Sequence, residues 1–156
     1  MGTKKKLDGV IDIQLSVDNR KQFRINGDDK RIIELDISDI GILNRLRESY
    51  PRLQELSTKG FEADDSGNDE SVNLGEFIDS LNAINDEMIS IMDYIFDSKV
   101  AKICADGKPL YNMVAGKFIF EIILDTLFNL YSDNIRAEFG QMSQRMKSHT
   151  SKYTGN

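Results

Sequence analysis

Residues 74–96 read LGEFIDSLNAINDEMISIMDYIF, and the spacing of their apolar side chains decides the fold class. Apolar residues recur every three or four positions, and acidic residues, asparagines and serines occupy most positions between them. The apolar set consists of Phe77, Ile78, Leu81, Ile84, Met88, Ile91, Met92, Ile95 and Phe96. Side chains three and four apart share one face of a helix, so this pattern forms a continuous apolar stripe. The stretch predicts an amphipathic helix that packs against further helices.

A short helix, a turn and a second long helix are predicted to follow. Ser98 is a candidate N-cap for a short helix through Cys104, and residues 105–109 have the composition of a turn. The long helix is predicted from Leu110 to about Met142. Its polar residues form a narrow stripe, namely Lys117, Glu121, Asp125 and Asn129. Nearly all other positions in its first half are apolar, so it needs cover on several sides, either from the same domain or from a second molecule.

The N-terminal part of the chain has the period of β-strands. In residues 10–17, apolar side chains alternate with Asp12, Gln14 and Ser16, which predicts a half-buried strand. Residues 21–26 and 31–35 predict two further strands. Between them lies Asn26-Gly27-Asp28-Asp29, and a hairpin turn is favoured there because Asn and Gly tolerate positive φ.

A helix is predicted over residues 37–59, capped by Asp36 or Ser38. Its apolar positions recur at helical spacing: Ile40, Leu43, Leu46, Tyr50 and Leu53. Pro51 lies inside this pattern, and proline removes a helical hydrogen bond, so a kink or a restart is predicted there. The pair Lys59-Gly60 is predicted to end the helix.

Residues 62–70 place five acidic side chains in nine positions. Side chains that carry oxygen alternate along this stretch and Gly67 occupies the sixth place, as in a calcium-binding loop of the EF-hand type. The closing position of such a loop requires glutamate, but the twelfth residue is Asn73. We therefore predict a solvated acidic loop over residues 60–72 and no calcium site.

The 156 residues have the usual length of one domain. We predict a single domain, 1–156, whose fold is mainly α with a small N-terminal β-hairpin or meander (α+β), arranged as a helical bundle of three to five helices. The predicted parts are a β-hairpin region at 10–36, a helix at 37–59, an acidic loop at 60–72 and a helical core at 73–147, with frayed ends at 1–9 and 148–156.

Charge and cysteine content narrow the classes of partner. A net charge of -6 and a pI near 4.8 repel phosphate backbones, so nucleic acid is not an expected partner. The apolar stretch from Leu110 to Tyr131 contains three charged residues, which disfavours a membrane span. Cys104 is the only cysteine, so no intrachain disulfide exists and a reducing cytoplasm is the expected location.

The sequence contains no recognisable catalytic or metal-binding motif. One histidine and one cysteine do not supply a zinc ligand set, and Cys104 beside Val100 and Ile103 is interpreted as a small buried hydrophobe. Asp93 and Asp97 are four residues apart, and we interpret them as a solvated helix face or a helix end and not as an acid–base pair. We therefore predict no catalysis, no cofactor and no metal.

Two parts of the chain carry a resemblance to a known family. The first part comprises FRINGD (23–28), IELDISD (33–39) and RL (45–46). The second comprises IMDYIFD (91–97), KVAKIC (99–104) and FIFEIILD (118–125). In these stretches, and in the order of a hairpin, a helix and two amphipathic helices, the chain resembles the tail assembly chaperones of siphophages and related prophages of Gram-positive bacteria.

The resemblance implies a protein of the bacterial host cytoplasm that is absent from the mature virion. It would act without catalysis by binding the phage tape measure protein before the tail tube polymerises; the tail tube protein and a second copy of the chain are further candidate partners. As partner-binding residues we propose Tyr111, Phe118, Ile122 and Tyr131, with the alternative that each fills the core. Other classes also fit, namely a structural head–tail or tail component of the virion and a host adaptor or regulatory protein.

Overall fold

The computed structural model describes residues 7–65 and 73–154. Within these ranges the helices are α1 (Ile42–Asp65), α2 (Leu74–Phe96), α3 (Ala101–Ala105) and α4 (Ile119–Thr154). The strands are β1 (Lys21–Ile25), β2 (Asp28–Leu35), β3 (Met113–Val114) and β4 (Lys117–Phe118). The predicted class, mainly α with a small N-terminal β-hairpin, is confirmed. None of these helices is both long enough and apolar enough to cross a membrane.

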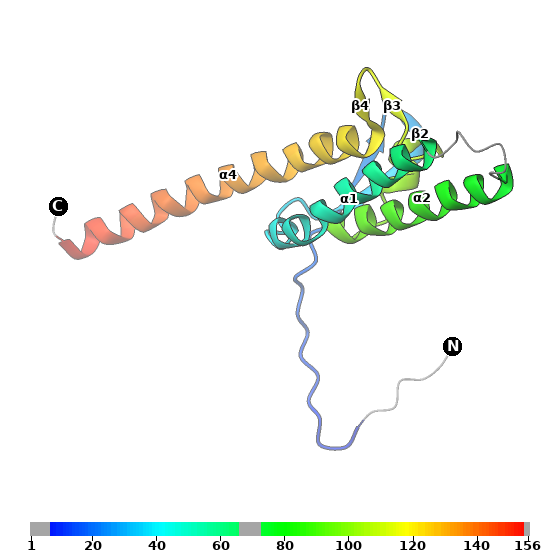
Figure 1. Ribbon diagram of the computed structural model, residues 1–156. Coiled ribbons are helices and arrows are strands. Elements are labelled where there is room, and N and C mark those ends of the chain that lie inside the picture. The colour runs from blue at the N-terminus through cyan, green and yellow to red at the C-terminus, as the bar shows by residue number, and fades with distance from the viewer. Residues whose placement is uncertain (1–6, 66–72, 155–156) are drawn as a thin grey trace.

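The helices α1 and α2 pack side by side, and α4 begins against them and then leaves the body (Figure 1). The C-terminal half of α4 projects into solvent, and the segment before β1 runs outward in another direction. Two extended pieces of chain therefore leave one packed body.

The N-terminal hairpin forms as predicted. Antiparallel β1 and β2 pair Phe23 with Ile33 and Lys21 with Leu35. Asn26 (φ 52°) and Gly27 (φ 71°) form the two-residue turn with positive φ that such hairpins prefer. Ile33 and Leu35 are buried on one face of the sheet, so the hairpin forms one wall of the core.

The predicted strand at residues 10–17 is wrong for the isolated chain. The segment pairs with no other strand in the described residues, and its apolar side chains, from Val10 to Val17, are 62–88 % exposed. Alternation of apolar and polar residues indicates a strand with one apolar face. It does not indicate whether that face packs against the same molecule or against another. The hairpin therefore begins at Lys21 and not near residue 10.

Helix α1 is shifted and longer than predicted. It starts at Ile42 and continues past Gly60 to Asp65, with Pro51 inside it and no restart there. A glycine in a helix costs only about 1 kcal/mol relative to alanine, which the flanking helical residues offset. Residues 60–65 are thus helical, and the remainder of the predicted acidic loop, residues 66–72, lies outside the described residues.

Helix α2 has the predicted span, and Asn73 and Asp97 cap its two ends. The Asn73 side chain accepts a hydrogen bond from the Gly75 N–H (2.9 Å), and Asp97 (φ 49°) ends the helix in the left-handed conformation. Ser98 does not cap α3. Instead, one carboxylate oxygen of Asp93 accepts from the N–H groups of Val100 (2.9 Å) and Ala101 (3.0 Å).

The predicted start of the last helix is wrong because a second hairpin precedes it. β3 and β4 pair Met113 with Phe118 through a turn at Ala115 (φ 53°) and Gly116 (φ 82°). Helix α4 then starts at Ile119 and runs to Thr154, beyond the predicted end. The segment 148–154, predicted to be frayed, is helical because no proline or glycine interrupts the sequence between Gly140 and Gly155.

The core lies where the first hairpin, α1, α2, α3 and the first half of α4 meet. It contains Ile33, Leu35, Ile42, Leu53, Leu56, Met88, Met92, Ile95, Phe96, Val100, Ala101, Ala105, Leu110, Ile119, Phe120, Ile123, Leu124, Leu127, Tyr131 and Ile135. The rings of Phe96 and Tyr131 join α2 to α4, with centroids 5.9 Å apart. Ile135 is the last core residue along α4, so the packed body ends there.

Candidate functional site

A largely apolar groove of about 480 Å³ lies between α1 and α4. Residues from α1 form one wall and residues from α4 form the other: Leu43, Leu46, Arg47, Tyr50 and Pro51, and Glu121, Leu124, Asp125 and Phe128. Two helix faces therefore leave room for side chains between them.

The spacing of residues along α1 explains why the groove exists. Leu53 and Leu56 of α1 are buried in the core, whereas Leu46 and Tyr50 are half-buried and Leu43 is 44 % exposed. The apolar stripe of α1 is thus wider than its neighbours cover, and its N-terminal part faces α4. An apolar surface left open in this way is typical of a binding site for another apolar group.

Charged side chains of both signs also line the groove. Arg47 lies on the α1 side, and Glu121 and Asp125 lie on the α4 side. None of the three forms a salt bridge within the described part of the chain. These charges therefore remain available to polar groups of a partner. A surface that is apolar at its centre and charged at its edge is typical of protein–protein interfaces.

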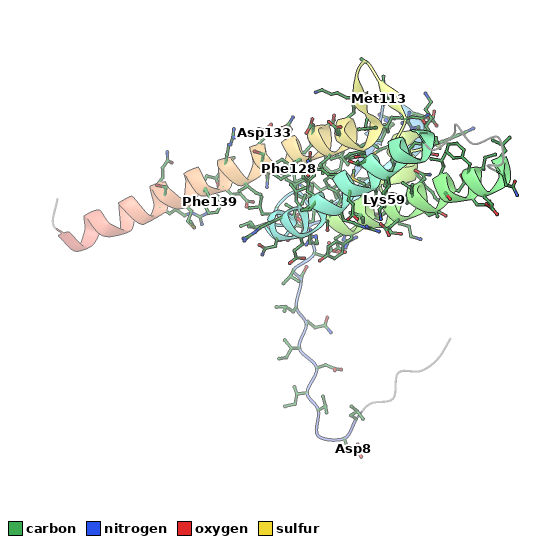
Figure 2. The ribbon with its side chains drawn as sticks, in the orientation of Figure 1. Asp8, Lys59, Met113, Phe128, Asp133 and Phe139 are labelled. Atoms are coloured by element: carbon green, nitrogen blue, oxygen red, sulfur yellow. The ribbon has the colours of Figure 1, made fainter. Side chains whose placement is uncertain are left out.

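The α4 wall of the groove continues past the body. With 3.6 residues per turn, Leu124, Phe128, Ile135, Phe139 and Met142 fall on one side of α4. Leu124 and Ile135 are buried, but Phe139 and Met142 are about half exposed. Figure 2 shows Phe128 near the body and Phe139 on the projecting part of the helix. The same apolar stripe that packs on the core therefore extends beyond it.

The four residues predicted to bind a partner do not form one surface. Tyr131 is 1 % exposed, and burial raises the pKa of its hydroxyl to about 12. It belongs to the core, so it offers no surface to a partner. Phe118 is half-buried and stacks on Phe120, and Tyr111 is also half-buried. Ile122 is partly exposed, on the side of α4 that is turned away from the groove.

Sequence reasoning missed Leu43, Leu46 and Tyr50 of α1 as surface residues because they continue the helical spacing of the core residue Leu53. The number of apolar positions on this helix is the sequence signal that indicates an uncovered apolar surface. A single neighbouring helix covers only part of such a wide stripe.

A second, polar hollow of about 220 Å³ lies where the N-terminal segment meets the body. Its lining consists of Val17, Asp18, Arg20, Asp36, Asp39, Phe96 and Asp97. Arg20 binds Asp97 (Nη2 to Oδ2, 3.1 Å). No group of three or more His, Cys, Asp or Glu side chains within residues 7–65 and 73–154 is arranged to hold a metal ion.

Arg45 fixes the wall of this hollow. It donates to the Ile95 carbonyl (2.8 Å) and to Asp39 Oδ2 (2.8 Å), and Gly41 N–H donates to the other Asp39 oxygen (2.9 Å). Burial by itself would raise the pKa of the Asp39 carboxyl, but the hydrogen bonds from Arg45 and Gly41 and the charge of Arg45 outweigh it, so this pKa is lowered. The hollow is therefore a structural junction between α1 and the end of α2.

Cys104 is half-buried, and burial raises the pKa of its thiol to about 11. Alkylation by iodoacetamide at pH 8 is expected to be roughly a hundredfold slower in the folded protein than in the urea-unfolded chain. The reason is that only the thiolate reacts, and a pKa of about 11 in place of 9.0 lowers the thiolate fraction by roughly this factor. Intact-mass spectrometry of quenched samples measures the two rates, and equal rates would contradict the expectation.

Comparison of the chain with protein-family models, curated proteins and solved structures found no match in any of the three sets.

Proposed function

We propose that the protein is a non-catalytic assembly chaperone that binds an amphipathic helix of another protein in the groove between α1 and α4. The observation that carries the proposal is the apolar stripe of α4, which lines the groove through Leu124 and Phe128 and continues onto the projecting helix as Phe139 and Met142. A helix laid along this stripe would bury its own apolar face over several turns, as in other helix-in-groove complexes.

The proposed client is the tape measure protein of a siphophage or prophage. This identity is supported by the sequence resemblance to tail assembly chaperones. A long helical client with apolar surface needs a receiving face that is apolar at its centre and charged at its edge. Arg47, Glu121 and Asp125 supply charges of both signs at that edge. They favour a client whose apolar stripe is flanked by both acidic and basic residues.

Two charge insertions in this surface test the proposal. Leu43→Glu in the groove and Phe139→Glu on the projecting helix are each expected to weaken binding of the tape measure protein from the same genome at least tenfold. Each places a carboxylate where the client would bury an apolar side chain, and a tenfold loss corresponds to about 1.4 kcal/mol. Titration calorimetry measures the affinity, and the soluble fraction of co-expressed tape measure protein measures the chaperone effect.

Ile78→Glu is the matched control. Ile78 lies on α2, does not line the groove and is 46 % exposed, close to the 44 % of Leu43. Ile78→Glu introduces the same charge at a similarly exposed position. Because this position lies outside the groove, the variant is expected to leave binding unchanged. Equal weakening by Leu43→Glu and Ile78→Glu would count against the groove. A wild-type protein that neither binds the tape measure protein nor raises its soluble fraction would overturn the proposed function.

A further inference from the structure

The segment of residues 10–17 combines two properties that do not suit a chain surrounded by water. Its apolar side chains, at Val10, Ile11, Ile13, Leu15 and Val17, are 62–88 % exposed. From Ile11 on they alternate strictly with polar residues, and alternation is the pattern of a strand with one covered face. The segment contains no proline or glycine, so nothing in its sequence prevents strand pairing.

The first hairpin offers an open strand edge. Its sheet contains only β1 and β2 within the described residues, so the outer edge of β1 has no strand beside it. The apolar face of the sheet is also incomplete on this side. Ile33 and Leu35 of β2 are buried, whereas Phe23 and Ile25 of β1 are only half-buried. A third strand next to β1 would complete both the hydrogen bonding and the apolar cover.

The charges of the segment and of β1 are complementary. Residues 7–18 contain Asp8, Asp12 and Asp18 and no basic residue. β1 carries Lys21 and Arg24 and no acidic residue. With the isoleucines of the segment on the apolar face beside Phe23, its aspartates lie on the opposite face of the sheet, which carries Arg24.

In the structure the segment leaves the body and does not lie beside β1 of its own chain. Asp18 accepts from the backbone N–H of Arg20 (3.1 Å), Arg20 binds Asp97 at the end of α2 (3.1 Å), and Asn19 donates to Ser38 Oγ (3.4 Å). These contacts fix residues 18–20 against the body, and the segment then runs away from it, with Asp8 near its far end (Figures 1 and 2). While these contacts hold, the segment points away from its own β1, and a second molecule is the partner that can present an open β1 edge to it.

We propose that residues 10–17 of one copy add as a strand to the outer edge of β1 in a second copy. Because each copy carries both the strand and the edge, reciprocal exchange closes a two-fold dimer. The dimer forms through surfaces outside the groove between α1 and α4, so it is independent of client binding there.

The oligomeric state tests the proposal. The wild-type protein is expected to be a dimer of about 35 kDa, twice the 17.7 kDa of the chain, by light scattering coupled to size exclusion. The double variant Ile13→Glu/Leu15→Glu is expected to raise the dimer dissociation constant at least tenfold, because it places charges on the face to be covered. The matched variant Gln14→Glu/Ser16→Glu adds the same charge to the same segment on the opposite face, and it is expected to dimerise like the wild type.

The origin of the strand is tested by cross-linking. Carbodiimide joins carboxylates to nearby lysines, and the aspartates of the segment lie on the face of position 24. An equal mixture of ¹⁴N- and ¹⁵N-labelled Arg24→Lys protein is therefore expected to give cross-links between Asp8 or Asp12 and residue 24 that join a light peptide to a heavy one. Cross-links confined to peptides of the same label would mean that the segment pairs within its own chain, which overturns the exchange. A wild-type protein that is monomeric at all concentrations overturns it as well, and so does a dimer that persists in Ile13→Glu/Leu15→Glu. Circular dichroism checks that all variants are folded, which is expected because the changed side chains lie outside the body.

Discussion

Replacing Phe96 by alanine is expected to lower the free energy of unfolding by about 3–5 kcal/mol. Phe96 is 2 % exposed at the C-terminal end of α2, and its ring packs against that of Tyr131 on α4. Removing the ring loses buried apolar surface and leaves a cavity where the two helices meet, and the fixed backbone refills such a cavity only in part. The loss is a large share of the roughly 5–15 kcal/mol that stabilises a typical domain. Urea unfolding followed by circular dichroism at 222 nm measures it.

Leu74→Ala is the control for this prediction. Leu74 lies at the other end of α2 and is 69 % exposed, so its replacement is expected to change the stability by no more than about 0.5 kcal/mol. The two variants lose large apolar side chains from the same helix and differ in burial. If both lost the same small amount of stability, the packing of α2 on α4 would not be as described.

Replacing Asp93 by alanine is expected to cost about 2 kcal/mol. One carboxylate oxygen accepts the N–H groups of Val100 and Ala101, which begin α3, and both of these residues are buried. Alanine leaves these N–H groups without their acceptor, and an unsatisfied buried donor costs about 1–3 kcal/mol. Asp93→Asn retains an oxygen at the same place and is expected to lose less. Urea unfolding measures the stability, and faster hydrogen exchange at the amides of Val100 and Ala101 locates the effect.

Asp79→Ala is the control for Asp93→Ala. It removes a negative charge from α2 but leaves the cap of α3 intact. Asp79 is exposed on the same helix, so removing it is expected to leave both the stability and the exchange of the two amides close to wild type. Asp93 would have no capping role if Asp93→Ala matched Asp79→Ala in both measurements.

The elements that the sequence predicted well depend on neighbouring residues alone. The stripe of residues 74–96 predicts α2 because helical spacing is local, and Asn26-Gly27 predicts the first hairpin because its turn requires two residues that accept positive φ. The short hairpin of β3 and β4 was hidden by the apolar residues around it, although Ala115-Gly116 is a two-residue turn with a glycine. A run that is apolar almost throughout has no clear period, so the start of α4 could not be read from it.

Which apolar side chains are core and which are surface was decided by the tertiary structure. Tyr131 and Phe139 both lie on the apolar stripe of α4, yet one is buried and the other is half exposed, because the body ends near Ile135. Asp93 became the cap of α3 because the chain turns back toward it after α2, which the spacing to Asp97 did not reveal. Sequence by itself determined the periodicities, and hence the helices, the hairpin and the surplus of apolar residues on α1 and α4. Only the packing of distant segments decided where that surplus forms a groove, because burial depends on contacts between residues far apart in the chain.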